Sequence, residues 1–353
     1  MPEKLELIHR SSEPEALEFP FHELSEYVTP NDLFFIRSHY PTPKVDIESF
    51  ELSVEGKVGN PAGLTMGDLL AMPQVSVHSM LECAGNGRSC LNPPVAGLQW
   101  ELGAIGSAVW TGVSVRTVLE HAGIDSTAVD IVFQGMDSGK VKTEPRPIGD
   151  VPYARSLPKD IAMADGPILA YEMNGEILSP AHGYPLRLIV PGWYAAASVK
   201  WLNRIIVMDS KFMGYYQTTD YAFWDTQDGH PVQVPLGPMP VKSAIARPVE
   251  GTKLTGGDTA IIYGAAWGDV EVVRVEVSVN GGESWNDANL IHDAVHGNWR
   301  HWDYTWKVDG QLGSRKLLSR ATDAKGNSQP LERDWNYGTY VINHCHPTEV
   351  FVE

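Results

Sequence analysis

The chain has 353 residues, a hydrophobic fraction of 43% and a formal net charge of -17 at pH 7. This length exceeds what a single core usually supports, so we expect two globular domains, and the 33 glycines and 25 prolines favour many strands and turns. The negative charge argues against a nucleic-acid surface and against an acidic membrane as partners, although a few convergent arginines could still bind a small anion.

The first 30 residues are acidic and interrupted by proline, which predicts an extended arm. From there to about residue 235, strand and helix signals mix without regular alternation, which favours a mixed α/β domain. Apolar or alternating runs predict its strands, at residues 50–54, 75–83, 131–133, 186–190 and 199–207. Capping residues predict two short helices at 65–72 and 114–123, and Asn174-Gly175 predicts a turn.

The character of the chain changes near Pro240, after a stretch rich in proline and glycine. We therefore expect domains at residues 1–240 and 241–353. In the second domain, Val273, Val275, Val277 and Val279 alternate with polar residues, and roughly seven short strands in about 100 residues predict an immunoglobulin-like β-sandwich.

The 3 cysteines, Cys83, Cys90 and Cys345, fit no disulfide framework, as is typical of a reducing compartment. The N-terminal residues contain neither an apolar segment nor twin arginines, and no run of about 18 apolar residues occurs anywhere. These features predict a soluble cytoplasmic protein. The sequence also has no Cys-x-x-Cys-His motif, so covalently attached c-type haem is not expected.

Cys83 is the residue on which the function most depends. It lies where a predicted strand runs into a loop with two glycines, followed by Asn86 and Arg88. A thiolate in such a loop can bind a metal, the glycines permit close approach of the backbone, and the arginine can bind an anion. An isolated cysteine is nevertheless most often a small buried residue, so the loop alone leaves both interpretations open.

Four further segments contain polar residues that suit ligand binding: Arg37-Ser-His39, Trp100, His182 with Arg187 and Lys200, and Tyr221. The cationic group around His182 lies beside glycines and suits phosphate or another dense anion. Each segment also has an ordinary explanation on its own. Arg37-Ser-His39 could be the end of a strand, Trp100 could lie in the core, and the cations near His182 could be surface charges. Tyr221 alone is a single tyrosine without a motif. Common enzyme motifs such as Gly-x-Gly-x-x-Gly and His-Glu-x-x-His are absent from the sequence.

Taken together and in order, five motifs resemble the sulfite oxidase family of molybdenum enzymes: Phe34-Phe-Ile-Arg-Ser-His39, Leu81-Glu-Cys-Ala-Gly-Asn-Gly-Arg88, Trp100-Glu-Leu-Gly-Ala-Ile-Gly106, His182-Gly-Tyr-Pro-Leu-Arg187 and Val199-Lys-Trp201. The resemblance covers nearly the whole chain. It implies an α+β fold, in which a mixed α/β molybdopterin domain precedes an immunoglobulin-like dimerisation domain. It also implies a homodimer and a molybdenum-molybdopterin cofactor without haem.

The resemblance assigns roles residue by residue. Cys83 would be the metal ligand, while Tyr221, Arg37, Arg88 and Trp100 would surround the substrate as catalytic residues. The implied cofactor-binding residues are Phe34, Phe35, Ile36, Arg37, Ser38, His39, Leu81, Glu82, Cys83, Asp137, His182, Arg187, Ser198, Val199 and Lys200.

The implied reaction is the oxidation of sulfite to sulfate, with electrons passed to an external acceptor, either dioxygen or a redox protein. Two features depart from the family pattern. The arginine that commonly follows a Trp-Asn pair in the second domain is missing from Trp335-Asn336-Tyr337-Gly338, and Gly87 stands where many relatives carry arginine. The missing arginine favours an alternative, reduction of nitrate or an S-oxide, whereas Tyr221 favours sulfite. A non-catalytic dimeric binding protein is a third hypothesis.

Overall fold

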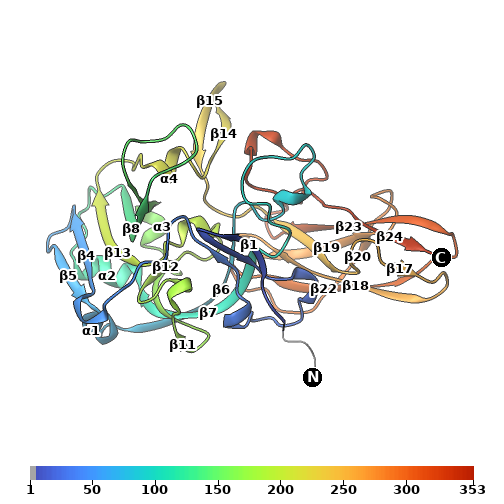
Figure 1. The fold of residues 1–353 in the computed structure, drawn as a ribbon, viewed down its shortest axis with the longest axis horizontal. Helices are drawn as coiled ribbons and strands as arrows, with labels where there is room; N and C mark the ends of the chain where they lie inside the picture. Colours follow the sequence, from blue (N-terminus) through green and yellow to red (C-terminus); the bar gives the residue numbers. More distant parts are fainter. Residues whose placement is uncertain (1–4) are drawn as a thin grey trace.

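The computed structural model describes residues 5–353, which form a mixed α/β region followed by a β-sandwich (Figure 1). At the start, β1 (Ile8–Ser12) pairs with β2 (Glu15–Glu18), and β2 pairs with β3 (Ile36–Arg37). The predicted extended arm is therefore wrong for residues 5–30, and residues 1–4 lie outside the described part of the chain. Its acidic composition suggested exposure, but Glu18 is buried and accepts hydrogen bonds from Arg10 and from the backbone N–H of Gly103.

Two five-stranded sheets form the rest of the α/β region. The first has the order β11-β10-β7-β6, with β12 also paired to β10, and the second has the order β5-β4-β13-β8-β9. The bounds of these strands are β4 (Glu51–Gly56), β5 (Ala62–Thr65), β6 (Gln74–Glu82), β7 (Ile105–Ser114), β8 (Asp130–Gly139), β9 (Val151–Pro158), β10 (Ile168–Met173), β11 (Glu176–Ile177), β12 (Arg187–Ile189) and β13 (Leu202–Met208). The predicted strands are confirmed, except that the last begins at Leu202 because the preceding residues form turns.

In the described part of the chain, four short α-helices accompany these sheets: α1 (Met66–Ala71), α2 (Val115–His121), α3 (Lys159–Ala162) and α4 (Tyr215–Thr218). The two predicted caps are confirmed. Thr65 and Asp68 form a reciprocal capping box on α1, and the Ser114 hydroxyl accepts the N–H of Thr117 at 3.0 Å on α2. The predicted turn at Asn174-Gly175 joins β10 to β11, with both residues at positive φ.

The second region is the predicted sandwich, with its core between two sheets. A four-stranded sheet has the order β16-β18-β22-β21 and a five-stranded sheet has the order β17-β24-β23-β19-β20. Their bounds are β16 (Lys242–Arg247), β17 (Lys253–Leu254), β18 (Thr259–Trp267), β19 (Val272–Ser278), β20 (Asn286–Asp287), β21 (Asn289–Leu290), β22 (Arg300–Lys307), β23 (Gly313–Asp323) and β24 (Thr348–Val352). The expected alternation holds for Val275 and Val277, which are buried, but a shift of register after Val272 leaves Val273 exposed.

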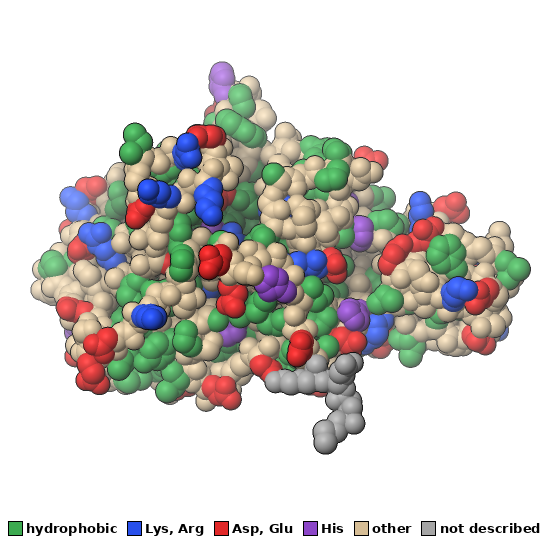
Figure 2. Space-filling model, viewed as in Figure 1, with side chains coloured by type: hydrophobic (Ala, Val, Ile, Leu, Met, Phe, Trp, Pro, Cys, Tyr) green, Lys and Arg blue, Asp and Glu red, His purple; other side chains and the backbone are tan. Residues whose placement is uncertain are grey.

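A hairpin joins the two regions and projects from the molecular surface (Figures 1 and 2). It consists of β14 (Ala222–Gln227) and β15 (His230–Pro235), which form a two-stranded sheet with each other. The stretch rich in proline and glycine thus forms a hairpin as well as a boundary, and Asp228 and Gly229 make its tight turn, with both at positive φ. The hairpin begins directly after Tyr221.

A buried ion pair connects the α/β region to the sandwich. Glu82, the last residue of β6, accepts hydrogen bonds from the Lys242 ammonium and from the indole N–H of Trp267, both at 2.9 Å. This pair holds the loop that begins at Cys83 against the second domain. Among residues 5–353, no helix is long and apolar enough to cross a membrane.

Candidate active site

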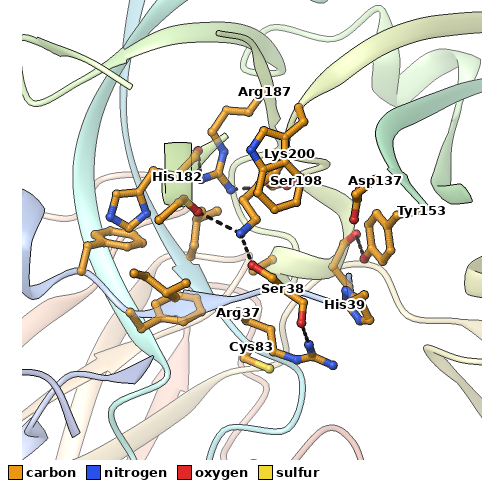
Figure 3. Close-up of a pocket in the computed structure, with 18 of the residues that line it drawn as sticks. Arg37, Ser38, His39, Cys83, Asp137, Tyr153, His182, Arg187, Ser198 and Lys200 are labelled. Carbon is orange, nitrogen blue, oxygen red and sulfur yellow. Dashed lines mark hydrogen bonds between the residues drawn. The ribbon is translucent and has the colours of Figure 1, made fainter. Parts of the chain in front are cut away.

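Four of the five sequence motifs contribute residues to one cavity in the α/β region (Figure 3), and Trp100 of the fifth packs beside it against Phe34 and Cys83. β3 and the residues beside it form one wall, the loop after β6 forms another, and the turns between residues 181 and 201 form a third. The lining residues are Phe34, Phe35, Ile36, Arg37, Ser38, His39, Leu81, Cys83, Ala84, Asp137, Tyr153, Ala181, His182, Arg187, Ala195, Ala196, Ser198, Lys200, Trp201 and Tyr221.

Cys83 lies on the cavity wall as a free thiol, in a loop with a fixed backbone. Its N–H donates to the carbonyl of Ala104 at 2.9 Å and its own carbonyl accepts the N–H of Asn86 at 2.9 Å. The Asn86 side chain in turn bonds Glu82 and the N–H of Ala104. Burial raises the pKa of the Cys83 thiol, and the nearby Arg37 partly offsets this. A bound metal ion would shift the balance to the thiolate.

A group of buried cations lies elsewhere on the cavity wall. The Lys200 ammonium donates to the Ser38 hydroxyl and the Ala181 carbonyl, each at 2.9 Å, and Arg187 donates to the carbonyls of His182 and Ser198 (Figure 3). Burial lowers the pKa of Lys200 to about 7 and that of Arg187 to about 9. Two cations held by neutral carbonyl and hydroxyl groups favour a dense anion as their missing partner.

Buried polar atoms in the same cavity lack partners. Within residues 5–353, Asp137 Oδ1 and Arg187 Nε are buried and accept or donate no hydrogen bond. Burial raises the pKa of Asp137 to about 7, and burial with the neighbouring cations lowers that of His182 to about 3, so this histidine is neutral. Since buried polar atoms are nearly always paired, these atoms indicate a polar ligand with both donors and an anionic group. The residues present therefore fit a phosphate-bearing pterin.

Close packing at two glycines shapes the cavity surroundings. A Cβ at Gly135 would lie 2.6 Å from both Asp137 Oδ1 and the Lys200 carbonyl oxygen, and a Cβ at Gly85 would lie 2.3 Å from Arg88 Nη2. A side chain at Gly135 would displace the Asp137 carboxylate or the Lys200 backbone, and one at Gly85 would displace the Arg88 guanidinium.

Arg37, His39 and Tyr221 form the part of the cavity near Cys83 that suits a small anion. The Tyr221 hydroxyl lies 2.7 Å from Nε2 of His39, whose ring stacks on Tyr153 with centroids 4.5 Å apart. Burial and the neighbouring Arg37 lower the pKa of His39 well below its usual range, so the imidazole is neutral. Burial raises the pKa of Tyr221, so the phenol keeps its proton and can donate it.

Comparison with known proteins identifies the family. The oxidoreductase molybdopterin binding domain family matches residues 39–216, and the Mo-co oxidoreductase dimerisation domain family matches residues 235–353. Sulfite oxidase from Gallus gallus is 37% identical over 91% of this chain and 72% of its own length. The chain belongs to the sulfite oxidase family.

Two further proteins are similar to nearly the whole of this chain. Mitochondrial sulfite oxidase from Rattus norvegicus is 35% identical over 97% of this chain, which spans 65% of the length of the rat protein. The sulfane dehydrogenase SoxCD from Paracoccus pantotrophus superimposes with a TM-score of 0.82 at 27% identity, covering 97% of this chain and 87% of that chain. The sulfite-oxidase-type fold is thus confirmed by sequence and by structure.

Four residues that we assigned to the site from the family resemblance do not line the cavity. Glu82 directs its side chain to the second domain, and Val199 is fully buried with its carbonyl bonded to the N–H of Leu188. Trp100 is fully buried beside the cavity and its indole N–H lacks a partner among the described residues. The Arg88 guanidinium is bonded to backbone carbonyls of Thr339 and Leu98. Their roles remain predictions.

Sequence reasoning missed Tyr153, which lines the cavity from β9. Its hydroxyl donates to the Ala196 carbonyl at 2.7 Å and its ring supports His39. No local motif could reveal it, because Tyr153 follows the ordinary pattern of a buried strand and reaches the site only through the packing of β9 on the turn at residues 195–197.

Proposed function

We propose that the protein binds a molybdenum cofactor in this cavity and oxidises sulfite to sulfate there. The observation that carries the proposal is the position of the Cys83 thiol in one cavity with Arg37, Tyr221 and the buried cations at Arg187 and Lys200. A metal-binding thiol, a site for a small anion and a site for a phosphate are the three features that this reaction requires. The printed names of its relatives, sulfite oxidase and sulfane dehydrogenase, agree with a sulfur substrate.

The cofactor-holding residues follow from the chemistry of their side chains. Cys83 would bind the metal, and Lys200, Arg187 and Ser198 would bind the phosphate of the pterin. Asp137, with an unpartnered oxygen, would accept a hydrogen bond from the pterin amines. When bound, the cofactor would supply the two-electron redox change and the transfer of oxygen.

The residues near the anion would bind and orient the substrate. Arg37 would neutralise the sulfite charge at the end of the cavity near Cys83. Neutral His39 can donate its Nε2 proton to the phenol oxygen of Tyr221, which leaves the phenol proton free for an oxygen of the anion. The net reaction adds the oxygen of water to sulfite and releases two protons and two electrons.

The proposal also covers the domain boundary, the oligomeric state, the localisation and the electron acceptor. We place the domain boundary near Pro240, between residues 1–240 and 241–353, and propose a cytoplasmic homodimer formed through the second domain, which matches the dimerisation domain family. The electrons would pass to an external acceptor, dioxygen or a redox protein, and not to a haem within residues 5–353. Light scattering at micromolar concentration should give the mass of a dimer, and a monomer would contradict this part.

Steady-state kinetics test the proposed reaction. Molybdenum-replete protein should reduce ferricyanide when sulfite is supplied, and it should oxidise reduced viologen slowly or not at all with nitrate or an S-oxide. The opposite result would replace sulfite oxidation by the reductase alternative, which the missing second-domain arginine favours. Protein that purifies without molybdenum and without either activity would favour the non-catalytic binding protein.

A further inference from the structure

The second domain reaches back to the anion end of the cavity through a loop at residues 338–341. This loop follows the 3-10 helix η7 (Trp335–Tyr337) and lies beside the loop after β6 (Figure 1). The N–H of Val341 donates to the carbonyl of Ala84, the residue after Cys83, at 3.1 Å. Val341 has φ +52°, a strained conformation for a β-branched residue, so its surroundings must impose this geometry.

Two arginines hold the loop from opposite domains. Arg88, from the first domain, donates Nε and Nη2 to the carbonyl of Thr339 at 3.1 and 3.0 Å and Nη1 to the carbonyl of Leu98 at 2.8 Å. Arg333, from the second domain, donates to the carbonyls of residues 338, 340 and 341. The three bonds of Arg88 use three of its five N–H groups, so the position of the guanidinium is set by the loop at residues 338–341 and by Leu98.

Tyr340 contacts Tyr221, which lines the cavity, and Arg88, which lies behind the cavity wall but close enough to lower the pKa of both Cys83 and Tyr221. Its ring packs on Tyr221 with centroids 5.1 Å apart and planes 30° apart, and the Arg88 guanidinium carbon lies 5.5 Å from the Tyr340 ring centroid. Its hydroxyl donates to Oδ1 of Asp220, and the same oxygen accepts the N–H of Tyr221 at 3.0 Å. Tyr221 itself has φ +54°, so its backbone is held in an uncommon conformation at the point where Tyr340 and Asp220 meet it.

We propose that Tyr340, with Asp220, is a positioning element of the candidate active site, through which the second domain sets the placement of Tyr221 and Arg88 around the bound oxyanion. The ring of Tyr340 supports both side chains, and its hydroxyl fixes the carboxylate that holds the Tyr221 backbone. Burial raises the pKa of Tyr340 well above its usual range, so this hydroxyl stays a donor. The inference rests on the proposed function, since it takes the oxyanion to bind at this end of the cavity.

Sulfate binding to the cofactor-loaded dimer tests the proposal by calorimetry, without any turnover. Tyr340→Phe keeps the ring contacts and removes the bond to Asp220, so the Kd for sulfate should rise about tenfold. Tyr337→Phe is the matched control, because it removes a hydroxyl from the helix η7 directly before the loop, and the Tyr337 ring packs on Phe223 and not on the site. It should bind sulfate like the unmodified protein. Equal weakening in both variants would show a general effect on the loop and overturn the proposal.

Asp220 provides a second, independent pair of variants. Asp220→Asn retains an oxygen that accepts both hydrogen bonds, whereas Asp220→Ala retains none, although both remove the charge. Asparagine should therefore keep sulfate affinity within about threefold, and alanine should weaken it about tenfold. In sulfite turnover the losses should lie mainly in KM, because the anion contacts are already made in the ground state. An equal loss in both Asp220 variants, or a loss in kcat alone, would contradict positioning of the anion site.

Failure of this inference can be told apart from failure of the proposed function. If Tyr340→Phe weakens sulfate binding while no variant oxidises sulfite, the positioning role stands and the reaction assignment falls. If sulfite is oxidised and the Tyr340→Phe protein binds sulfate normally, the positioning role falls and the reaction assignment stands.

Discussion

Two buried lysines differ in their partners, and this difference predicts opposite effects of the same substitution. Lys242 forms an ion pair with Glu82 at 2.9 Å. The Lys200 ammonium instead bonds a hydroxyl and a carbonyl and lies 4.3 Å from the centroid of the Trp201 ring. We assign Lys200 to a cofactor phosphate, so in cofactor-free protein its charge is buried without its proper partner.

The size of the effect follows from the pKa of Lys200, which burial lowers from 10.5 to about 7. At about 1.4 kcal/mol per unit, holding the ammonium charged in the folded state costs at most ~5 kcal/mol, and local relaxation and water entry reduce this figure. Lys200→Met should therefore stabilise the cofactor-free protein by about 1–3 kcal/mol. It should also weaken retention of the cofactor roughly tenfold to hundredfold, the value of one hydrogen bond to a charged group.

The gain in stability has a defined pH dependence. The folded protein loses the Lys200 proton near pH 7 and the unfolded chain loses it near 10.5, so the unfolded state binds more protons between these values. The stability cost of Lys200 is therefore fully present below about pH 7 and vanishes as the pH approaches 10.5. The advantage of Lys200→Met should shrink across this window.

Denaturant unfolding of cofactor-free protein, together with fluorescence of the oxidised pterin extracted from loaded protein, measures both effects. Lys242→Met is the matched control and should destabilise the protein by about 3–5 kcal/mol, because it leaves Glu82 buried and unpaired. A Lys200→Met protein that loses stability without its cofactor, or that retains the cofactor as well as the unmodified protein, would refute the assignment of Lys200 to an anion site.

Three other substitutions test separate parts of the structure. Cys83→Ser should abolish molybdenum binding, measured by metal analysis, while pterin retention falls less than about tenfold because the phosphate contacts are unchanged. Gly85→Ala should raise KM for sulfite about tenfold to hundredfold, because its Cβ would lie 2.3 Å from Arg88 Nη2, and an unchanged KM would remove Arg88 from the site. Thr65→Ala removes the cap of α1 and should cost about 1 kcal/mol in urea unfolding with unchanged kinetics.

Local features of the fold were predictable because their causes are local. The caps at Thr65 and Ser114 and the turn at Asn174 satisfy backbone groups within a few residues, so the sequence there is sufficient. The N-terminal strands and the bulge at Val273 could not be predicted, because a strand forms where another strand offers an edge, and this depends on distant residues. The hairpin after Tyr221 combined turn residues with prolines, a composition equally typical of a linker.

The residues of the site also divide into those that the sequence could predict and those that it could not. The cationic residues and Cys83 could be predicted because several ordered motifs, each weak alone, pointed to the same ligand. Tyr153 and Tyr340 could not, since each has an ordinary strand or loop context and meets the site only through packing between distant segments. Glu82 illustrates the converse case, because it belongs to a motif yet its side chain serves the contact between the domains.

The most direct measurement of the central claim is the sulfate formed when molybdenum-loaded protein is mixed with sulfite in the absence of an electron acceptor. A single turnover should give about one sulfate per molybdenum, and Cys83→Ser protein should give none. No sulfate from protein that contains molybdenum would contradict the account, as would full conversion by the Cys83→Ser variant.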